Sequence, residues 1–186
     1  MTQKKVFMND SVEDDTLEVR QLMLIPGKWK SFLTEYEYKT MVASALNTCV
    51  VEHGLIIFGY LITFEKIYLV VETSKDSAFS ITRDFLIAFR ITLIRHFAAL
   101  AKKGVPFLPS MKIFTTSDEA TLFEDYFFDD PILSQLLVNK NTELPYYDPQ
   151  LKKIQEWLLN CDFCSYNKHA DEIGSVITHM AGIKKM

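Results

Sequence analysis

The sequence predicts an α+β fold, a ferredoxin-like antiparallel sheet with helices packed on one face and a small helical C-terminal extension. Three observations support this. Runs rich in β-branched and aromatic residues alternate with longer amphipathic segments, in the order strand, helix, strand, strand, helix, strand, helix. Only four residues separate the two middle strands, as in an antiparallel hairpin. The first six elements of this order are those of the ferredoxin-like arrangement.

The first two elements have clear local signals. Residues 17–25 alternate well enough to predict a strand, and a Pro-Gly pair follows it. Thr34 and Glu37 form a capping box, in which each side chain can bond the other residue's backbone amide. Apolar residues then recur at helical spacing as far as about His53, and Gly54 ends the predicted helix.

The middle of the chain predicts a hairpin followed by a long helix. Residues 55–62 and 67–72 are rich in β-branched and aromatic side chains and form the two hairpin strands. Apolar residues at helical spacing predict a helix over 80–103, which Gly104 ends. Residues 107–114 are expected to form a further strand.

A second capping box, Thr116-Ser117-Asp118-Glu119, predicts a helix that continues to about Phe128 and ends at Asp129-Asp130-Pro131. Residues 150–160 predict an amphipathic helix. The chain therefore divides into a flexible lead-in (1–16), a main domain (17–138), and a linker with a helical extension (139–186).

Composition limits the class of protein. The chain has 186 residues, 48% of them hydrophobic, which is enough for a sizeable core. Its formal net charge of −4 argues against a surface that is basic throughout. No apolar run approaches the roughly 18 residues of a membrane span. We therefore expect no membrane partner. The three cysteines are an odd number, so we expect a cytoplasmic protein with reduced thiols.

Two segments resemble the single-tyrosine HUH transposase family, which includes the REP-associated tyrosine transposases and insertion-sequence transposases. Residues 32–72 read FLTEYEYKTMVASALNTCVVEHGLIIFGYLITFEKIYLVVE, and residues 125–137 read DYFFDDPILSQLL. The resemblance covers about residues 32–132. It implies an HUH-type fold and cleavage of one DNA strand by a tyrosine, with Mg²⁺ or Mn²⁺ on the scissile phosphate. It places Tyr126 at the nucleophile position and Asp130 at the position of a third metal ligand.

The two histidines that define this chemistry are replaced. Lys66 and Tyr68 stand at their positions, where alternation along a strand would turn both side chains to one side. A lysine ammonium has no lone pair to donate, and a neutral tyrosine is a poor ligand. We therefore expect no metal or other cofactor, and a DNA-binding protein that has lost strand cleavage, with single-stranded or hairpin DNA as its ligand.

Basic residues on the helix predicted over 80–103 are candidates for contacts with DNA phosphates: Arg83, Arg90, Arg95 and Lys102. That helix carries a single acid, Asp84. The same pattern also fits the solvated side of an ordinary amphipathic helix.

Three further hypotheses remain open. An active nuclease or transposase would need a metal site rebuilt from carboxylates, with Glu65, Glu72, Asp129 and Asp130 as candidates. A protein–protein interaction domain, or a homodimer, would keep only the scaffold. Finally, Cys161, Cys164 and His169 have the spacing of half a zinc site, although buried structural cysteines and a surface histidine explain them better.

Overall fold

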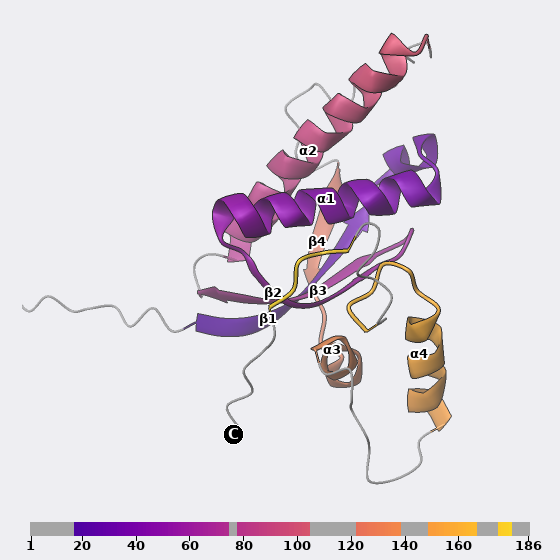
Figure 1. The fold of residues 1–186 in the computed structure, drawn as a ribbon. Coiled ribbons are helices and arrows are strands. Elements are labelled where there is room, and N and C mark those ends of the chain that lie inside the picture. The colour runs from indigo at the N-terminus through magenta and orange to yellow at the C-terminus, as the bar shows by residue number, and fades with distance from the viewer. Residues whose placement is uncertain (1–16, 75–77, 105–121, 139–148, 167–174, 180–186) are drawn as a thin grey trace, which may run out of the picture.

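In a computed structural model the protein forms a four-stranded antiparallel sheet with helices on both faces (Figure 1). The structure describes residues 17–74, 78–104, 122–138, 149–166 and 175–179. The strands are β1 (Leu17–Pro26), β2 (Ile56–Ile62), β3 (Ile67–Ser74) and β4 (Phe123–Phe127). Their order across the sheet is β2-β3-β1-β4, so β1 pairs with β3 on one side and β4 on the other. The α+β class and the antiparallel hairpin are confirmed.

The two long helices cover one face of the sheet, as predicted. They are α1 (Glu35–His53) and α2 (Ala78–Lys102), and a short 3₁₀ helix η1 (Lys28–Phe32) precedes α1. The capping box is present, because the Glu37 amide donates to Thr34 Oγ1 and the Thr34 amide donates to a Glu37 carboxylate oxygen. At the other end Gly54 takes φ 69°, a left-handed conformation that suits glycine and ends α1.

The main core lies between this helical layer and the sheet. Trp29 of η1 stands at its centre, with ring centroids 5.2 Å from Phe89 and 5.4 Å from Phe123. Its indole Nε1 donates to the Leu122 carbonyl at 2.6 Å. The contact joins η1 to α2 and to the start of β4, and its polar end is satisfied inside the core.

The prediction of a helix that continues to about Phe128 was wrong, because residues 123–127 form strand β4. β1 offers a second hydrogen-bonding edge, and the aromatic-rich sequence FEDYF pairs with it antiparallel, from Leu22 opposite Phe127 to Pro26 opposite Phe123. Pairing with β1 thus accounts for the strand conformation of residues 123–127. The strand predicted at 107–114 and the second capping box lie outside the described residues.

A short helix that the sequence analysis did not predict, α3 (Pro131–Val138), packs on the opposite face of the sheet. Together with α4 (Pro149–Leu159), the helix predicted over 150–160, it builds a second apolar cluster. Its buried members are Leu61, Leu133, Leu136, Leu137, Leu151, Leu158 and Cys164. Gly59 of β2 allows the close approach, since a Cβ at this position would lie 2.7 Å from the Leu137 backbone.

The C-terminal segment closes the free edge of β2. The Ile62 amide donates to the Phe163 carbonyl and the Ser165 amide donates to the Tyr60 carbonyl. Further along, the His179 amide donates to the Ile57 carbonyl at 2.8 Å. Residues far apart in sequence therefore extend the hydrogen bonding of the sheet beyond its outermost strand.

We expect Gly59→Ala to destabilise the protein by about 1–3 kcal/mol, because the new methyl group overlaps backbone atoms of α3 that cannot rotate away. Urea unfolding measures the loss. Gly54→Ala is the control, since it strains a left-handed residue but meets nothing within 4 Å. Faster hydrogen exchange in α3 should appear only in the Gly59 variant, and equal exchange in both variants would contradict the assigned contact.

Candidate functional site

Tyr68 and Tyr126, two of the predicted site residues, lie in one row across the sheet with Met23 between them. Met23 of β1 is opposite Tyr68 of β3 on one side and opposite Tyr126 of β4 on the other. Directly opposed residues turn their side chains to the same face. Tyr68 and Tyr126 therefore share one face, with their Cα atoms about 10 Å apart because each strand spacing contributes about 4.8 Å.

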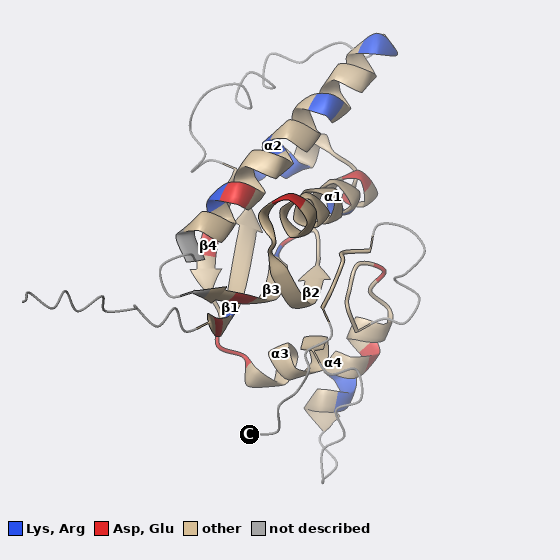
Figure 2. Ribbon diagram, turned by 60° about the vertical axis from the view of Figure 1, so that its left-hand side comes forward, with Lys and Arg blue, Asp and Glu red and all other residues tan. Residues whose placement is uncertain are grey.

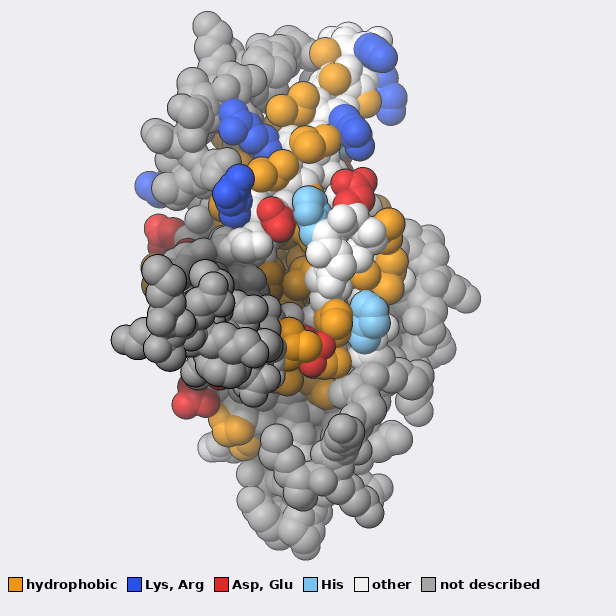
Figure 3. Space-filling view, turned by 90° about the vertical axis from the view of Figure 1, so that its left-hand side faces the viewer, with side chains coloured by type: hydrophobic (Ala, Val, Ile, Leu, Met, Phe, Trp, Pro, Cys, Tyr) orange, Lys and Arg blue, Asp and Glu red, His pale blue; other side chains and the backbone are white. Residues whose placement is uncertain are grey.

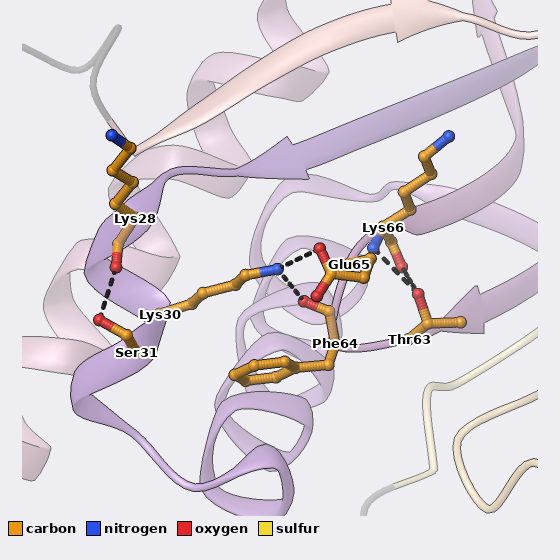
Figure 4. A network of polar contacts seen from close by, with 7 residues as sticks. All are labelled: Lys28, Lys30, Ser31, Thr63, Phe64, Glu65 and Lys66. Carbon is orange, nitrogen blue, oxygen red and sulfur yellow. Dashed lines mark hydrogen bonds and ion pairs between the residues drawn. The ribbon is translucent and has the colours of Figure 1, made fainter.

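Lys66 lies at the hairpin, immediately before β3. Its amide donates to Thr63 Oγ1 at 2.9 Å, and its carbonyl accepts from the Thr63 amide and hydroxyl. Figure 4 shows the Lys66 side chain leading away from the neighbouring Lys30–Glu65 pair. That pair is joined at 2.6 Å, and Lys30 Nζ also donates to the Phe64 carbonyl. Lys66, at a predicted position of a lost histidine, and Glu65, a candidate carboxylate ligand, thus both form part of the turn.

Tyr68 packs against apolar neighbours. Its ring meets Phe128 edge-on, with centroids 5.3 Å apart, and it lies against the second apolar cluster, beside α3. A half-buried aromatic ring thus stands where the resemblance would predict a metal-binding histidine. The arrangement is one of packing between the sheet and α3.

Tyr126 is 46% exposed, and its hydroxyl donates to the Glu124 carboxylate at 2.7 Å. This hydrogen bond and the negative charge of Glu124 raise the pKa of the Tyr126 phenol. A nucleophilic tyrosine needs the opposite change, because attack requires the phenol to lose its proton. The sequence analysis missed Glu124, since the pairing of residues two apart becomes visible only once this segment is a strand.

Asp130 serves α3. Its Oδ1 accepts a hydrogen bond from the Leu133 amide at 2.9 Å, and Pro131 occupies the first position of the helix. Aspartate before a helix and proline at its first position are standard helix-start residues. The sequence analysis interpreted the same residues as a helix end, although the signal for a start was present. The carboxylate at the third-ligand position is therefore engaged in capping.

The basic residues proposed for DNA contact lie elsewhere. Arg83, Arg95 and Lys102 are exposed on α2, and Arg90 is half-buried there. Figure 2 shows basic positions recurring along α2, with a single acidic one. Because α2 and the row containing Tyr126 are on opposite faces of the sheet, the structure does not bring the basic residues and the tyrosine together.

The other candidates are also dispersed. Glu65 precedes β3 and Glu72 lies near the far end of that strand. At a rise of about 3.3 Å per residue, the two residues are roughly 20 Å apart. Cys164 is buried in the second apolar cluster, Cys161 Sγ lies 3.3 Å from the Trp157 carbonyl, and His169 is outside the described residues. Within the ranges that the structure describes, no three His, Cys, Asp or Glu side chains converge on a point suitable for a metal.

Comparison with known proteins adds no assignment. No protein-family model, curated protein or solved structure matches this chain. Among the described helices, none combines the length and apolar character that crossing a membrane requires.

We expect Asp130→Ala to lower the free energy of unfolding by about 1 kcal/mol, because α3 loses its N-terminal cap. Asp130→Asn should change it little, since asparagine caps a helix about as well. Urea denaturation of both variants measures the difference. An asparagine variant as unstable as the alanine variant would mean that the charge of Asp130, and not its capping hydrogen bond, matters.

We also expect the Tyr126 phenol to have a raised pKa, and Glu124→Gln to lower that pKa, since the negative charge of Glu124 and the hydrogen bond to a charged acceptor are lost. The ¹³Cζ chemical shift of Tyr126 followed against pH reports this directly. Glu156→Gln, at an exposed position of α4, is the control and should leave the titration unchanged. A Tyr126 titration insensitive to residue 124 would refute the proposed interaction.

Proposed function

We propose that this protein binds single-stranded or hairpin DNA through the basic side of α2, on a ferredoxin-like scaffold of the HUH transposase type, and does not cleave it. The strand order β2-β3-β1-β4 supports the scaffold, because it is the order of two interlocked split β-α-β units. The resemblance of residues 32–72 and 125–137 to the transposase family supports the ligand class.

The observation that carries the proposal is the segregation of charge. A chain of net charge −4 concentrates four basic residues along one helix that holds a single acid. That acid, Asp84, lies 3.8 Å from His53, so its charge faces a basic group when the histidine is protonated. A basic helix on an otherwise acidic protein attracts a polyanion to one side of the molecule.

The proposed loss of cleavage is supported by the surroundings of Tyr126, Asp130 and Tyr68. The Tyr126 phenol has a raised pKa, the Asp130 carboxylate caps α3, and Tyr68 packs against Phe128. DNA held on α2 would also lie across the sheet from Tyr126. Each of these features opposes in-line attack on a bound phosphate.

The proposal predicts salt-dependent DNA binding that depends on α2. Affinity for a labelled DNA hairpin, measured by fluorescence anisotropy between 50 and 200 mM salt, should fall linearly on logarithmic axes, about one unit of slope per phosphate contact. Arg83→Gln with Arg95→Gln should therefore reduce the slope by about two.

The matched control is Lys152→Gln with Lys153→Gln, which removes the same charge from the exposed side of α4. It should retain the full slope. Incubation with Mg²⁺ or Mn²⁺ should yield no cleaved strand. Absence of binding, or equal losses in both double variants, would disprove a DNA site on α2, and a nick abolished by Tyr126→Phe would reinstate the active enzyme.

A second candidate is an interaction domain for an acidic protein helix, favoured by a specific feature of the same surface. Ile87, Ile91 and Ile94 are 38–46% exposed and follow one another at helical spacing. By helical geometry, Arg83 and Arg90 border this aliphatic stripe on one side and Arg95 and Lys102 border it on the other. Apolar stripes with charged borders suit an amphipathic helix of opposite charge.

Different substitutions should weaken binding in the two candidate functions, so they distinguish a DNA ligand from an acidic peptide. Ile87→Ser with Ile94→Ser leaves every charge in place, so it should spare binding to phosphates and weaken binding of an acidic amphipathic peptide. Calorimetry with such a peptide, beside the DNA measurements above, assigns the surface to one ligand class.

A further inference from the structure

The two margins of the sheet are treated differently. The C-terminal segment covers the edge of β2, where the Ile62 amide donates to the Phe163 carbonyl and the His179 amide donates to the Ile57 carbonyl. β4 forms the opposite margin (Figure 2). Within the described part of the chain, β1 is the one strand that pairs with β4. The outer edge of β4 is therefore available to a further strand.

The hydrogen-bond pattern shows which backbone groups of β4 point outward. The Phe128 amide donates to the Gln21 carbonyl, one position beyond the last pair of the β1–β4 ladder. Bonded pairs alternate along an antiparallel ladder, so the even-numbered residues of β4 are those that bond β1. The amides and carbonyls of Asp125 and Phe127 therefore point to the outer edge, and both residues are exposed.

Acidic and aromatic side chains flank this edge. Opposed residues share a face, so Glu124 and Tyr126 lie on the α3 side of the sheet and Asp125 and Phe127 on the α2 side. Each face thus presents one carboxylate and one aromatic ring. The Tyr126 hydroxyl that donates to Glu124 at 2.7 Å is neutral, so the charge of Glu124 remains. Among the described residues, neither carboxylate forms an ion pair.

The charge around the edge is negative. Residues 124–130 include four acids and no base. Arg20 lies beside Phe127, with its Cζ 5.8 Å from the ring centroid, and pairs with Glu18 at 3.6 Å. Basic side chains gather instead over α2, in the upper part of Figure 3. The two surfaces therefore favour ligands of opposite charge, a cationic one at β4 and an anionic one at α2.

We infer that the edge of β4 binds an extended peptide as a fifth strand, in which two aliphatic residues precede two basic residues. In an antiparallel alignment the basic side chains lie opposite Glu124 and Asp125, and the aliphatic ones lie opposite Tyr126 and Phe127. Backbone bonds supply affinity and the alternating side chains supply selectivity. A second copy of β4 fits less well, because pairing about the central residue brings two Asp125 carboxylates together. The inference goes beyond the proposed DNA binding and needs no residue of α2.

The test uses the blocked peptide acetyl-Thr-Val-Ile-Lys-Lys-Thr-amide, titrated into the ¹⁵N-labelled full chain. Saturable shifts and slower hydrogen exchange should appear at the amides of Asp125 and Phe127, which gain acceptors. The amides of Glu124 and Tyr126 already bond β1, so their exchange should change little. A peptide with two glutamates in place of the lysines should bind about twentyfold more weakly. No saturable binding, or equal binding of both peptides, would overturn the inference.

Methylation of the peptide backbone distinguishes strand pairing from charge attraction alone. In the antiparallel alignment the amide of the first lysine faces β4 and the amide of the second faces away. N-methylation of the first lysine should abolish saturable binding, because it removes a donor and places a methyl group inside the ladder. The same change at the second lysine keeps the charge and should preserve binding. Equal losses from the two methylations would refute strand addition.

Variants of the protein test the charges. Glu124→Gln with Asp125→Asn should weaken binding of the lysine peptide about fivefold, as expected for two exposed charge pairs. Glu156→Gln with Asp162→Asn removes the same charge from exposed positions elsewhere and should have no effect. Thermal melts verify that both variants are folded. Full affinity in the first variant, or a dimer of the free protein with protected Asp125 and Phe127 amides, would refute the assigned partner, whatever the outcome of the DNA experiments.

Discussion

The pairing of β1 on both its edges is the constraint on which the rest of the structure depends. β1 is the one strand that connects the hairpin half of the sheet to β4, through eight paired positions with β3 and five with β4. Trp29, just after β1, fixes the same junction by donating to the Leu122 carbonyl. Without this double pairing, neither the aromatic core nor the row of Tyr68, Met23 and Tyr126 would form.

The sheet also separates two chemistries. One layer, made by α1 and α2, carries the basic side chains. The opposite layer carries the tyrosines, the cap at Asp130 and the second apolar cluster. An antiparallel sheet about 10 Å from each packed layer keeps such surfaces apart, so a ligand on one face does not reach the other. Function at one layer can therefore be studied without disturbing the other.

Sequence reasoning succeeded where the signals were local. The Thr34–Glu37 capping box, the hairpin at 63–66 and the apolar periodicity of α2 each depend on residues close in the chain, and each element formed where predicted. β4 was mispredicted because its conformation depends on the open edge of β1, about a hundred residues earlier. Asp130-Pro131 fits either end of a helix on sequence alone, and only the partner of its carboxylate decides.

The C-terminal segment that closes the edge of β2 has a consequence for the growing chain. Tyr60 and Ser165 are bonded across 105 residues, so β2 is synthesised long before the segment that covers it. On the ribosome the hairpin can already exist, yet its outer edge stays open to other strands until Ser165 has left the exit tunnel. The outer edge of β2 is therefore exposed to wrong pairing until residues 163–165 are free to bond with it.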